Sequence, residues 1–477
     1  MTGSDSSSGS ATAPLRTIGA ALDRAVANRS SGHGTRINVA PGVYRESLIG
    51  TFNSAPSPVI VIQATEPGAV TISGADVWTG WSCSGDRCSK AWPYRWGTDP
   101  NPWRISIGEL ARRREMVLVN GTNLDQHMSL GALTPGSFFV DESAGRIHVR
   151  APAGVDLNAA VVEVAVRPRL MRLQGMSDFV VRGLRFSHAA SEFRSSAVQI
   201  VDQNRVVIED STFSWNGQTG ISFKGRDFTI RNTYMNNNGS SGFSGFKVAD
   251  VLFEDTESSY NNWRGERAAY RGWNVGHKFV SAHRLTLRRH VAVGNWTRGF
   301  WLDVDAARVV IEDSVFCDNR TNGIFVEASQ GPITIRDSVF CRNVESGLLT
   351  SATHRLTLES NVFYDNGRSA VHISGDFNRS STDWETGERY TLNNEDWTWL
   401  RNVMRASGDH LIISTTHPAD RFAALMASSR FSENTYWHAS RQEVFQVGGG
   451  SRLNFDGWRS RTSQDATSSF RVGGSPP

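Results

Sequence analysis

Short runs of β-branched and aromatic residues recur along the chain, and each is followed by polar residues and then by Asn or Gly. The central residues of successive runs are 22, 23, 34, 24, 24 and 23 residues apart. A strand-rich unit of this length buries its apolar side only by stacking on its neighbours. The pattern therefore predicts an all-β fold, a right-handed parallel β-helix. The central residues are Ile208, Ile230, Phe253, Leu287, Ile311, Ile335 and Leu358.

An asparagine recurs at one phase of this repeat. An amide side chain at such a position tolerates a left-handed backbone and can hydrogen-bond to its equivalent in the next turn of the coil, which we call a rung. We therefore expect an asparagine ladder, and we expect Phe316, Phe340 and Phe363 to stack inside the coil in the same way. The residues of the expected ladder are Asn216, Asn238, Asn295, Asn319, Asn343 and Asn366.

The pattern of apolar and polar residues changes outside the repeat. Apolar residues at helical spacing over 14–29 predict an amphipathic helix that covers the open end of the coil. Alternating segments between 75 and 167, with turns at Asn120-Gly121 and Ala144-Gly145, predict a small antiparallel β subdomain inserted into the coil. We therefore expect five parts: a disordered leader (1–14), a capping helix with the first rungs (15–74), the inserted subdomain (75–167), the main β-helix with the active site (168–376), and C-terminal rungs with a cap (377–477).

Charge and composition exclude some classes of function. Lys and Arg number 50 and Asp and Glu 47, a net charge of +3 without a basic patch, so a nucleic-acid partner is not expected. No apolar run is long enough to span a membrane. No cluster has the spacing of a zinc site, so no metal or other cofactor is expected, and nothing in the sequence indicates an oligomeric state.

The four cysteines form two local pairs. Cys83 and Cys88 lie five residues apart and can close a small disulfide, which suits an oxidising compartment and a secreted protein. Cys317 and Cys341 lie 24 residues apart and are expected to stack on neighbouring rungs. We interpret this second pair as two buried small hydrophobic residues in preference to a disulfide or a metal site.

Two carboxylates stand at equivalent positions of neighbouring repeats. Asp303 in GFWLDVD and Glu327 in GIFVEASQGP are 24 residues apart, and each precedes the centre of the next strand by eight residues. Strands of a parallel sheet are about 4.8 Å apart, so the two carboxyl groups are expected within about 5 to 6 Å. Retaining glycosidases hold their two carboxyl groups roughly 5 to 5.5 Å apart. The spacing thus favours Asp303 as nucleophile and the longer Glu327 as acid/base.

Acidic residues also stack on the solvated faces of repeat proteins. Asp303 and Glu327 differ from those residues because each lies in an apolar run, where an unpaired charge is costly. Asp305 lies two residues after Asp303, on the same expected strand face, and is the rival nucleophile; otherwise it raises the pKa of Glu327 or binds a sugar hydroxyl. The acidic residues interpreted as solvated surface are Glu209, Asp210, Glu254, Asp255, Glu312 and Asp313.

The two segments resemble those of the β-helix β-xylosidases of glycoside hydrolase family 120. GFWLD is similar to the WLD nucleophile segment of that family, and IFVEASQGP is similar to its FVE segment, which carries the acid/base. The resemblance also covers GWNVGHKF (272–279) and the VNG and PGSFFVD segments of the insertion. It implies a retaining hydrolase with Asp303 and Glu327 in these two roles and β-xyloside substrates. Asp305 and the triplet Ala-Ser-Gln after Glu327 depart from the family pattern and affect the expected sugar specificity.

Further residues near this column are candidates for binding the carbohydrate substrate. The spacing of 34 adds about ten residues within 260–278, on the rung before Asp303. Cationic and imidazole groups there either bind the substrate or close salt bridges to the carboxylates, and Trp rings can stack on sugar faces. For Trp301, inside the FWLD strand, a place in the core is an equal alternative. The candidates are Lys278, His277, Arg298, Trp263, Trp273, Trp296 and Trp301.

Two other classes of function use the same fold. A polysaccharide lyase would use Lys278 or an Arg as base and usually calcium, and the fold alone does not separate it from a hydrolase. A non-catalytic carbohydrate-binding solenoid would bind sugars without changing them. The favoured interpretation is a secreted retaining glycoside hydrolase.

Overall fold

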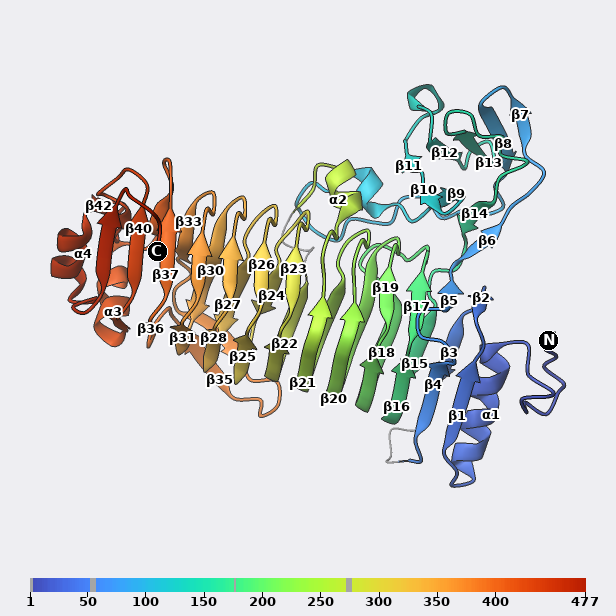
Figure 1. The fold of residues 1–477 in the computed structure, drawn as a ribbon, viewed down its shortest axis with the longest axis horizontal. Helices are drawn as coiled ribbons and strands as arrows, with labels where there is room; N and C mark the ends of the chain where they lie inside the picture. Colours follow the sequence, from blue (N-terminus) through green and yellow to red (C-terminus); the bar gives the residue numbers. More distant parts are fainter. Residues whose placement is uncertain (1–2, 52–56, 176, 272–276) are drawn as a thin grey trace.

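The computed structural model describes residues 3–51, 57–175, 177–271 and 277–477. It is a long coil of parallel strands with helix α1 (Ile18–Ser30) at one end and helices α3 (Ala419–Ser428) and α4 (Phe455–Thr462) at the other (Figure 1). The predicted all-β parallel β-helix, its capping helix and its inserted β subdomain are therefore confirmed. The candidate nucleophile and acid/base lie on the first of three faces of the coil.

This first face is a parallel sheet in which each rung contributes one strand. Residues that are equivalent in the repeat are direct neighbours, for example Ile324 and Leu348. Several strands are long and bend at a corner from this face onto the second one. The strands are β3 (Leu48–Thr51), β15 (Met171–Gln174), β18 (Ser196–Glu209), β20 (Thr219–Tyr234), β21 (Phe243–Glu257), β22 (Lys278–Arg288), β24 (Phe300–Asp303), β27 (Ile324–Ser329), β30 (Ser346–Thr353), β33 (Ser369–Ser374), β38 (Leu411–Thr415) and β41 (Phe445–Gln446).

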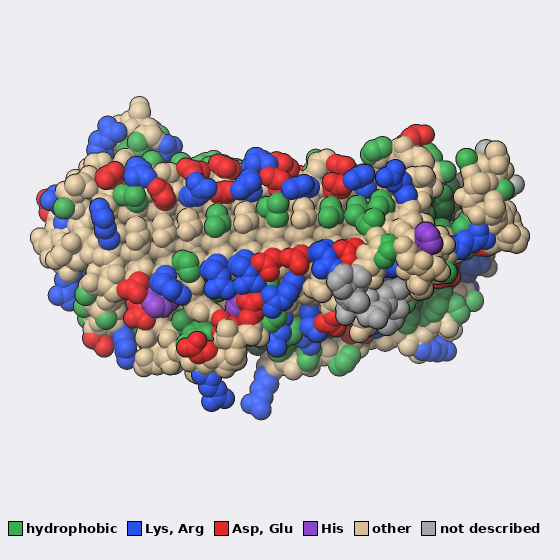
Figure 2. Space-filling view, turned by 90° about the horizontal axis from the view of Figure 1, so that it is seen from below, with side chains coloured by type: hydrophobic (Ala, Val, Ile, Leu, Met, Phe, Trp, Pro, Cys, Tyr) green, Lys and Arg blue, Asp and Glu red, His purple; other side chains and the backbone are tan. Residues whose placement is uncertain are grey.

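The second face carries the predicted central residues, and Ile311 pairs with Ile335 as the repeat requires. At its edge Glu312 bonds Arg288 at 2.5 Å, and such rows of opposite charge run along the coil (Figure 2). Glu312 is buried, so it is not the solvated residue we expected. The second halves of β18, β20, β21 and β22 join β1 (Thr35–Val39), β4 (Ile60–Ala64), β16 (Ser177–Arg182), β25 (Val309–Glu312), β28 (Ile333–Arg336), β31 (Leu356–Glu359), β36 (Thr398–Leu400) and β39 (Arg430–Ser432).

The third face consists of short strands, and Phe316, Phe340 and Phe363 stack inside it with ring centroids 5.4 and 4.6 Å apart. Its strands are β2 (Gly42–Tyr44), β5 (Val70–Ser73), β17 (Leu184–Ser187), β19 (Thr212–Ser214), β23 (Val291–Val293), β26 (Val315–Cys317), β29 (Val339–Cys341), β32 (Val362–Tyr364), β37 (Val403–Ala406), β40 (Thr435–His438) and β43 (Ser469–Val472). The short β42 (Arg452–Leu453) pairs antiparallel with β41 near the C-terminal cap.

The asparagine ladder is present, and each amide donates to the carbonyl of the next at about 3 Å, as Asn319 does to Asn343 at 3.0 Å. Asn261, which falls in the long spacing, also belongs to it. The left-handed residue is the one before each ladder position, such as Asp318 with φ 59°, and not the asparagine itself. The amide side chain thus serves to join rungs, while the preceding residue makes the turn.

The inserted subdomain stands beside the coil at the upper right of Figure 1 and has two small sheets around its own apolar core. Arg264 of α2 (Trp263–Arg267) joins it to the coil, because its buried guanidinium donates to the carbonyls of Gly217 and Glu115. The elements of the insertion are β6 (Ala75–Val77), β7 (Ser82–Ser84), β8 (Arg87–Ala91), η1 (Glu109–Arg112), β9 (Val117–Val119), β10 (Thr122–Asn123), β11 (Asp125–Gln126), η2 (Leu130–Ala132), β12 (Ser137–Asp141), β13 (Arg146–Arg150) and β14 (Val162–Ala165).

Two further segments depart from the coil. The hairpin of β34 (Arg379–Thr382) and β35 (Arg389–Leu392) leaves it after β33 and folds back over the second-face corner. Residues 3–14, which we expected to be disordered, form a hydrogen-bonded loop on the start of α1. Asp5 accepts hydrogen bonds from the backbone N–H groups of Arg16 and Thr17, both at 2.9 Å, and these bonds tie the loop to the helix N-terminus.

Both cysteine pairs are disulfides. The bond between Cys83 and Cys88 agrees with the sequence interpretation, whereas the bond between Cys317 and Cys341 corrects it. Parallel register makes Cys317 and Cys341 direct neighbours with Cα atoms 4.5 Å apart, within the range that a disulfide requires. The described part of the chain contains no helix long and apolar enough to cross a membrane.

We predict that replacing both Cys317 and Cys341 by Ser lowers the free energy of unfolding by about 3 kcal/mol, because the bond closes a loop of 24 residues in the unfolded chain. Thermal unfolding followed by circular dichroism, with and without reductant, measures the change. The matched double variant at Cys83 and Cys88, which closes a much shorter loop, should change less. Equal unfolding midpoints for the wild type and the first variant in non-reducing buffer would contradict the disulfide.

Candidate active site

Asp303 and Glu327 lie side by side on the first face. Strand β24 pairs with β27 so that Leu302 is opposite Val326, and the two carboxylates are the next residues in each strand. Leu302 and Val326 are fully buried in the coil, so the alternate residues point outward. The side chains of Asp303 and Glu327 retain 12 % and 16 % of their surface exposed to solvent. The two carboxylates are thus adjacent members of one outward-facing column.

Lys278 lies on the preceding rung and contacts Asp303. Lys278 pairs with Trp301 in the sheet, two residues before Asp303, and its Nζ lies 2.5 Å from Asp303 Oδ2. The other carboxylate oxygen, Oδ1, has no hydrogen-bond partner among the described residues. The predicted candidate Lys278 is therefore at the site as an ion-pair partner that offsets the charge of Asp303 and leaves one oxygen without a hydrogen bond.

Glu327 is held by two donors. Trp301 Nε1 donates to Oε2 at 3.1 Å, and Arg379 Nη1 donates to Oε1 at 2.5 Å. Burial raises the pKa of Glu327, and the neighbouring charge of Asp303 raises it further, while the hydrogen bond and charge of Arg379 oppose the shift. Burial and the charge of Asp303 thus disfavour the ionised form of Glu327, while Asp303 itself is ion-paired with Lys278.

Trp301 lies at the site but cannot stack on a sugar. Lys278 Nζ lies 3.8 Å from its ring centroid, and the ring of Phe325 stacks with it at 5.2 Å. Only 3 % of Trp301 is exposed. Its role in the structure is to orient Glu327 through the indole N–H, which neither of the two sequence interpretations included.

Arg298 lies beside the same aromatic pair. Its guanidinium is 4.6 Å from the ring centroid of Trp301 and 5.5 Å from that of Phe325. Burial lowers the pKa of Arg298, against the opposing charges of Glu345 and Glu327. Arg298 thus supplies a second positive charge next to the carboxylate column.

Asp305 does not lie on the face of Asp303. Strand β24 ends at Asp303, and Val304 and Asp305 both adopt left-handed backbone, with φ 45° and 61°. The equivalent residues Ser281 and Ala328 of the neighbouring rungs are also left-handed, which makes this position a corner of the coil. The expectation that a spacing of two residues keeps Asp305 on the same strand face is therefore wrong, because the strand turns between them.

The side chain of Asp305 is fully buried and bonds to the hairpin. Oδ1 accepts from Tyr390 at 2.7 Å and from Gln330 at 2.8 Å, and Oδ2 accepts from the backbone N–H of Trp384 at 2.8 Å. His283 Nε2 lies 3.3 Å from Oδ2. A carboxylate with this many partners is a structural anchor and is poorly suited to attack a substrate.

His277 is part of the coil interior. Its Nδ1 contacts the carbonyl of Gly299 at 2.9 Å, and its Nε2 contacts the amide of Asn261 in the ladder at 3.1 Å. Burial lowers its pKa to about 4, so it is neutral at physiological pH. The predicted role of His277 in substrate binding is wrong, because its side chain points inward.

The remaining tryptophan candidates lie away from the carboxylates or outside the described residues. Trp263 packs between the coil and the insertion, and its indole donates to the carbonyl of Asn237 at 3.1 Å. Trp296 lies at a corner with Arg320 over its ring at 5.0 Å. Trp273 lies outside the described residues. Of the three described tryptophans, Trp301 contacts a catalytic candidate.

Sequence reasoning missed Arg379, which lies 52 residues from Glu327 along the chain. The hairpin that carries Arg379 has no repeat period and no counterpart on other rungs. Only the exposed polar character of segment 377–395 marked it as different from the coil. Its contact with the site depends on tertiary folding.

One family model and several solved structures are similar to this chain. Residues 173–363 match a family model described as the right-handed beta helix region, and no curated protein sequence matches the chain. A solved structure of the A-module of Azotobacter vinelandii mannuronan C-5 epimerase AlgE4 is 14% identical, with a TM-score of 0.45, covering 96% of this chain and 93% of that one. A structure described as a glycoside hydrolase is 11% identical, with a TM-score of 0.47 and coverages of 99% and 94%.

A solved structure of XylC in complex with xylose has a higher TM-score, 0.75, at 16% identity. The match covers 100% of this chain and 86% of that chain. The whole of this chain therefore shares the parallel β-helix fold of XylC.

Proposed function

We propose that this protein is a retaining glycoside hydrolase that acts on glycosides derived from polysaccharides, with β-xylosides as its first candidate substrates. The observation that carries the proposal is the adjacent pair of Asp303 and Glu327 in one outward-facing column. Strands at about 4.8 Å bring such a pair to the spacing that retaining enzymes use, whereas an inverting pair needs roughly 6.5 to 9.5 Å.

In this proposal Asp303 attacks the anomeric carbon as Glu327 protonates the departing glycosidic oxygen. The bond between that carbon and the leaving oxygen breaks, and a covalent ester forms between the sugar and Asp303. Glu327, now ionised, takes a proton from water, whose oxygen attacks the same carbon and releases Asp303. The configuration at the anomeric carbon is retained because it is inverted twice.

The charges around the pair support these two roles. A nucleophile must be ionised, and Asp303 pairs with Lys278 at 2.5 Å. A general acid must hold its proton near neutral pH, and burial together with Asp303 raises the pKa of Glu327. Once Glu327 is ionised, Arg379 at 2.5 Å stabilises the charge that it carries in the second step.

The choice of sugar follows from the sequence resemblance, and the choice of compartment follows from the disulfides. The segments GFWLD and IFVEASQGP resemble the β-xylosidases of glycoside hydrolase family 120, and XylC, whose fold the chain shares, was solved with xylose. The two disulfides suit an oxidising compartment, so we propose that the protein is secreted. A lyase would release unsaturated products from a uronic-acid polymer, and a binding solenoid would leave every glycoside intact.

Replacing Asp303 by Asn should reduce turnover of aryl β-xylosides by about 10⁴-fold or more, because the nucleophile is lost. Initial rates across a panel of aryl glycosides and acidic polysaccharides measure this. Asp313→Asn, an exposed acidic residue on the same rung, is the matched control and should remain fully active. If Asp303→Asn were fully active and Asp305→Asn inactive, the nucleophile would be Asp305. Unsaturated products would show that the reaction is elimination and not hydrolysis.

Replacing Glu327 by Ala should slow glycosides with poor leaving groups by about 10² to 10⁴-fold, because they need a proton on the departing oxygen. Activated aryl glycosides should lose much less in the first step. Added azide should restore their turnover by attacking the intermediate without a base, and it should give a β-glycosyl azide. An α-configured azide product, or an equal loss for both substrate types, would contradict the role of Glu327.

Arg379→Gln should move the basic limb of the pH profile of kcat/KM to higher pH. Arg379 favours the ionised form of Glu327, so its removal raises the pKa of Glu327 further, and the acid stays protonated to higher pH. Rates of an aryl xyloside over a range of pH measure the shift. Arg389→Gln, an exposed residue of the same hairpin, should leave the profile unchanged. A downward shift in Arg379→Gln would mean that Arg379 does not act on Glu327.

A further inference from the structure

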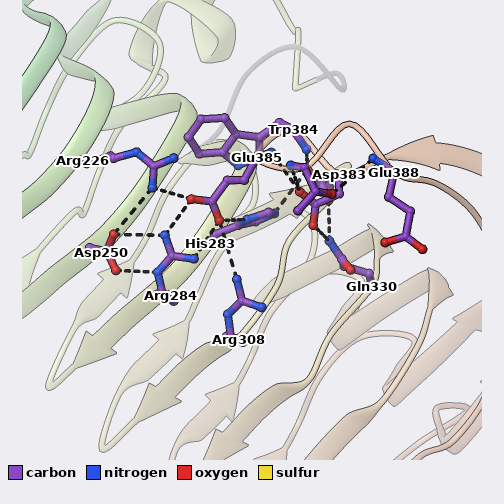
Figure 3. A network of polar contacts seen from close by, with 12 residues as sticks. Arg226, Asp250, His283, Arg284, Arg308, Gln330, Asp383, Trp384, Glu385 and Glu388 are labelled. Carbon is purple, nitrogen blue, oxygen red and sulfur yellow. Dashed lines mark hydrogen bonds and ion pairs between the residues drawn. The ribbon is translucent and has the colours of Figure 1, made fainter.

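Three potential metal ligands meet where the hairpin touches the coil. His283 comes from β22, Asp305 from the corner after β24, and Asp383 from the hairpin between β34 and β35. One ligand atom from each lies within 4.8 Å of the others. His283 and Asp305 are fully buried, and Figure 3 shows His283 and Asp383 converging from the two sides of the hairpin contact.

Glu385 determines which ring nitrogen of His283 carries the proton. His283 Nδ1 lies 2.6 Å from Glu385 Oε2, and Arg284 binds the same carboxylate with both terminal nitrogens, at 2.7 and 2.8 Å. A carboxylate that accepts two guanidinium N–H groups is an acceptor, so His283 Nδ1 donates to it and Nε2 is the ring nitrogen left free to bind a metal. A metal-binding histidine almost always donates its other ring N–H to a carboxylate, a backbone carbonyl or water, and Glu385 is such a partner here.

His283 Nε2 is buried and has no hydrogen-bond partner, although it faces Asp305. The distance from Nε2 to Asp305 Oδ2 is 3.3 Å, but the pair does not have hydrogen-bond geometry. Two acceptors at this distance repel unless a cation lies between them. Ligands in a tetrahedral site with bonds of about 2.0 to 2.1 Å are about 3.3 Å apart, which is the separation of this pair.

We propose that His283 Nε2, Asp305 and Asp383 bind one divalent transition-metal ion, for which zinc has the best match. An imidazole with two carboxylates is a donor set that zinc accepts, whereas calcium takes oxygen ligands alone. Two carboxylates and a neutral imidazole balance the charge of such an ion. This site lies on the opposite side of the corner from Asp303, so it has a structural role.

The ligands are themselves held in place, as metal ligands usually are. Gln330 Nε2 bridges Asp305 at 2.8 Å and Asp383 at 2.9 Å. Asp383 also accepts from the backbone N–H groups of Glu385 and Thr386, both at 2.9 Å. The carboxylates are therefore oriented before any ion binds.

An ion here would fasten the hairpin to the coil. Asp383 is a hairpin residue, whereas His283 and Asp305 belong to the coil, so the ion joins the two. The same hairpin carries Arg379, which binds Glu327. Metal binding would thus maintain the environment of the general acid without contacting the substrate.

The rival occupant is a proton. Burial lowers the pKa of His283, but Asp305 and Glu385 raise it by more, so an imidazolium between the two carboxylates would also balance the charge. Glu385 forms ion pairs with Arg284, Arg226 and Arg308. Asp383 accepts a hydrogen bond from a backbone N–H group. Among the described residues, no cationic side chain is a hydrogen-bond partner of His283 Nε2. Metal content separates the two occupants directly.

The test is elemental analysis of the full chain, purified without a metal-affinity tag and passed through a desalting column. We expect about one transition-metal ion per chain. Dialysis against dipicolinate should remove it and lower the thermal unfolding midpoint by several degrees, and added zinc should restore the midpoint while calcium should not. Asp383→Asn preserves side-chain shape and should lose at least tenfold in zinc affinity, measured by competition with a chromogenic chelator.

Glu388→Gln is the matched control, since Glu388 is an exposed carboxylate of the same hairpin, and it should bind zinc like the wild type. Absence of metal from the wild type, with no change of its unfolding midpoint on adding zinc or chelator, would overturn the proposal. Equal zinc affinity in Asp383→Asn and the wild type would also overturn it. These readouts do not depend on glycoside turnover, so they stand apart from the proposed hydrolysis.

Discussion

Register between stacked parallel strands is the constraint on which this structure depends. A slip of one residue would turn every outward side chain inward. The asparagine ladder prevents such a slip, since each buried amide bonds to the next rung, as Asn295 does to Asn319 at 2.9 Å. An amide without its partner in the core costs free energy. Because the ladder fixes the register, Asp303 and Glu327 are neighbours, and no additional interaction is needed to place them side by side.

Features that repeat were predictable from the sequence, and features that occur once were not. Ile311 and Ile335 pair as the spacing requires, because period converts directly into contact in a solenoid. The position of Asp305 was predicted wrongly because the corner of the coil is at Val304, and a valine there gives no sign of a turn in the hydrophobic pattern. The stacking of Cys317 on Cys341 was predicted correctly, but the spacing alone did not show that the two residues form a disulfide.

The candidate site is a joint product of the coil and the hairpin. The coil supplies Asp303, Glu327 and Lys278 from three successive rungs, and the hairpin supplies Arg379 from a distant part of the chain. Side-chain direction was the other limit on prediction. His277 and Lys278 are sequence neighbours that point to opposite sides, and only the structure assigns one to the ladder and the other to Asp303.

The corners of the coil have a consequence for how such a protein can change. The inserted subdomain, α2 and the hairpin all leave the coil between strands, where the strand pairing of neighbouring rungs is not interrupted. Loops attached in this way can be lengthened, lost or exchanged while the carboxylate column remains fixed. A lineage can therefore acquire new substrate preferences by replacing loops, with the reacting groups inherited unaltered, and a designer can graft loops between such coils on the same principle.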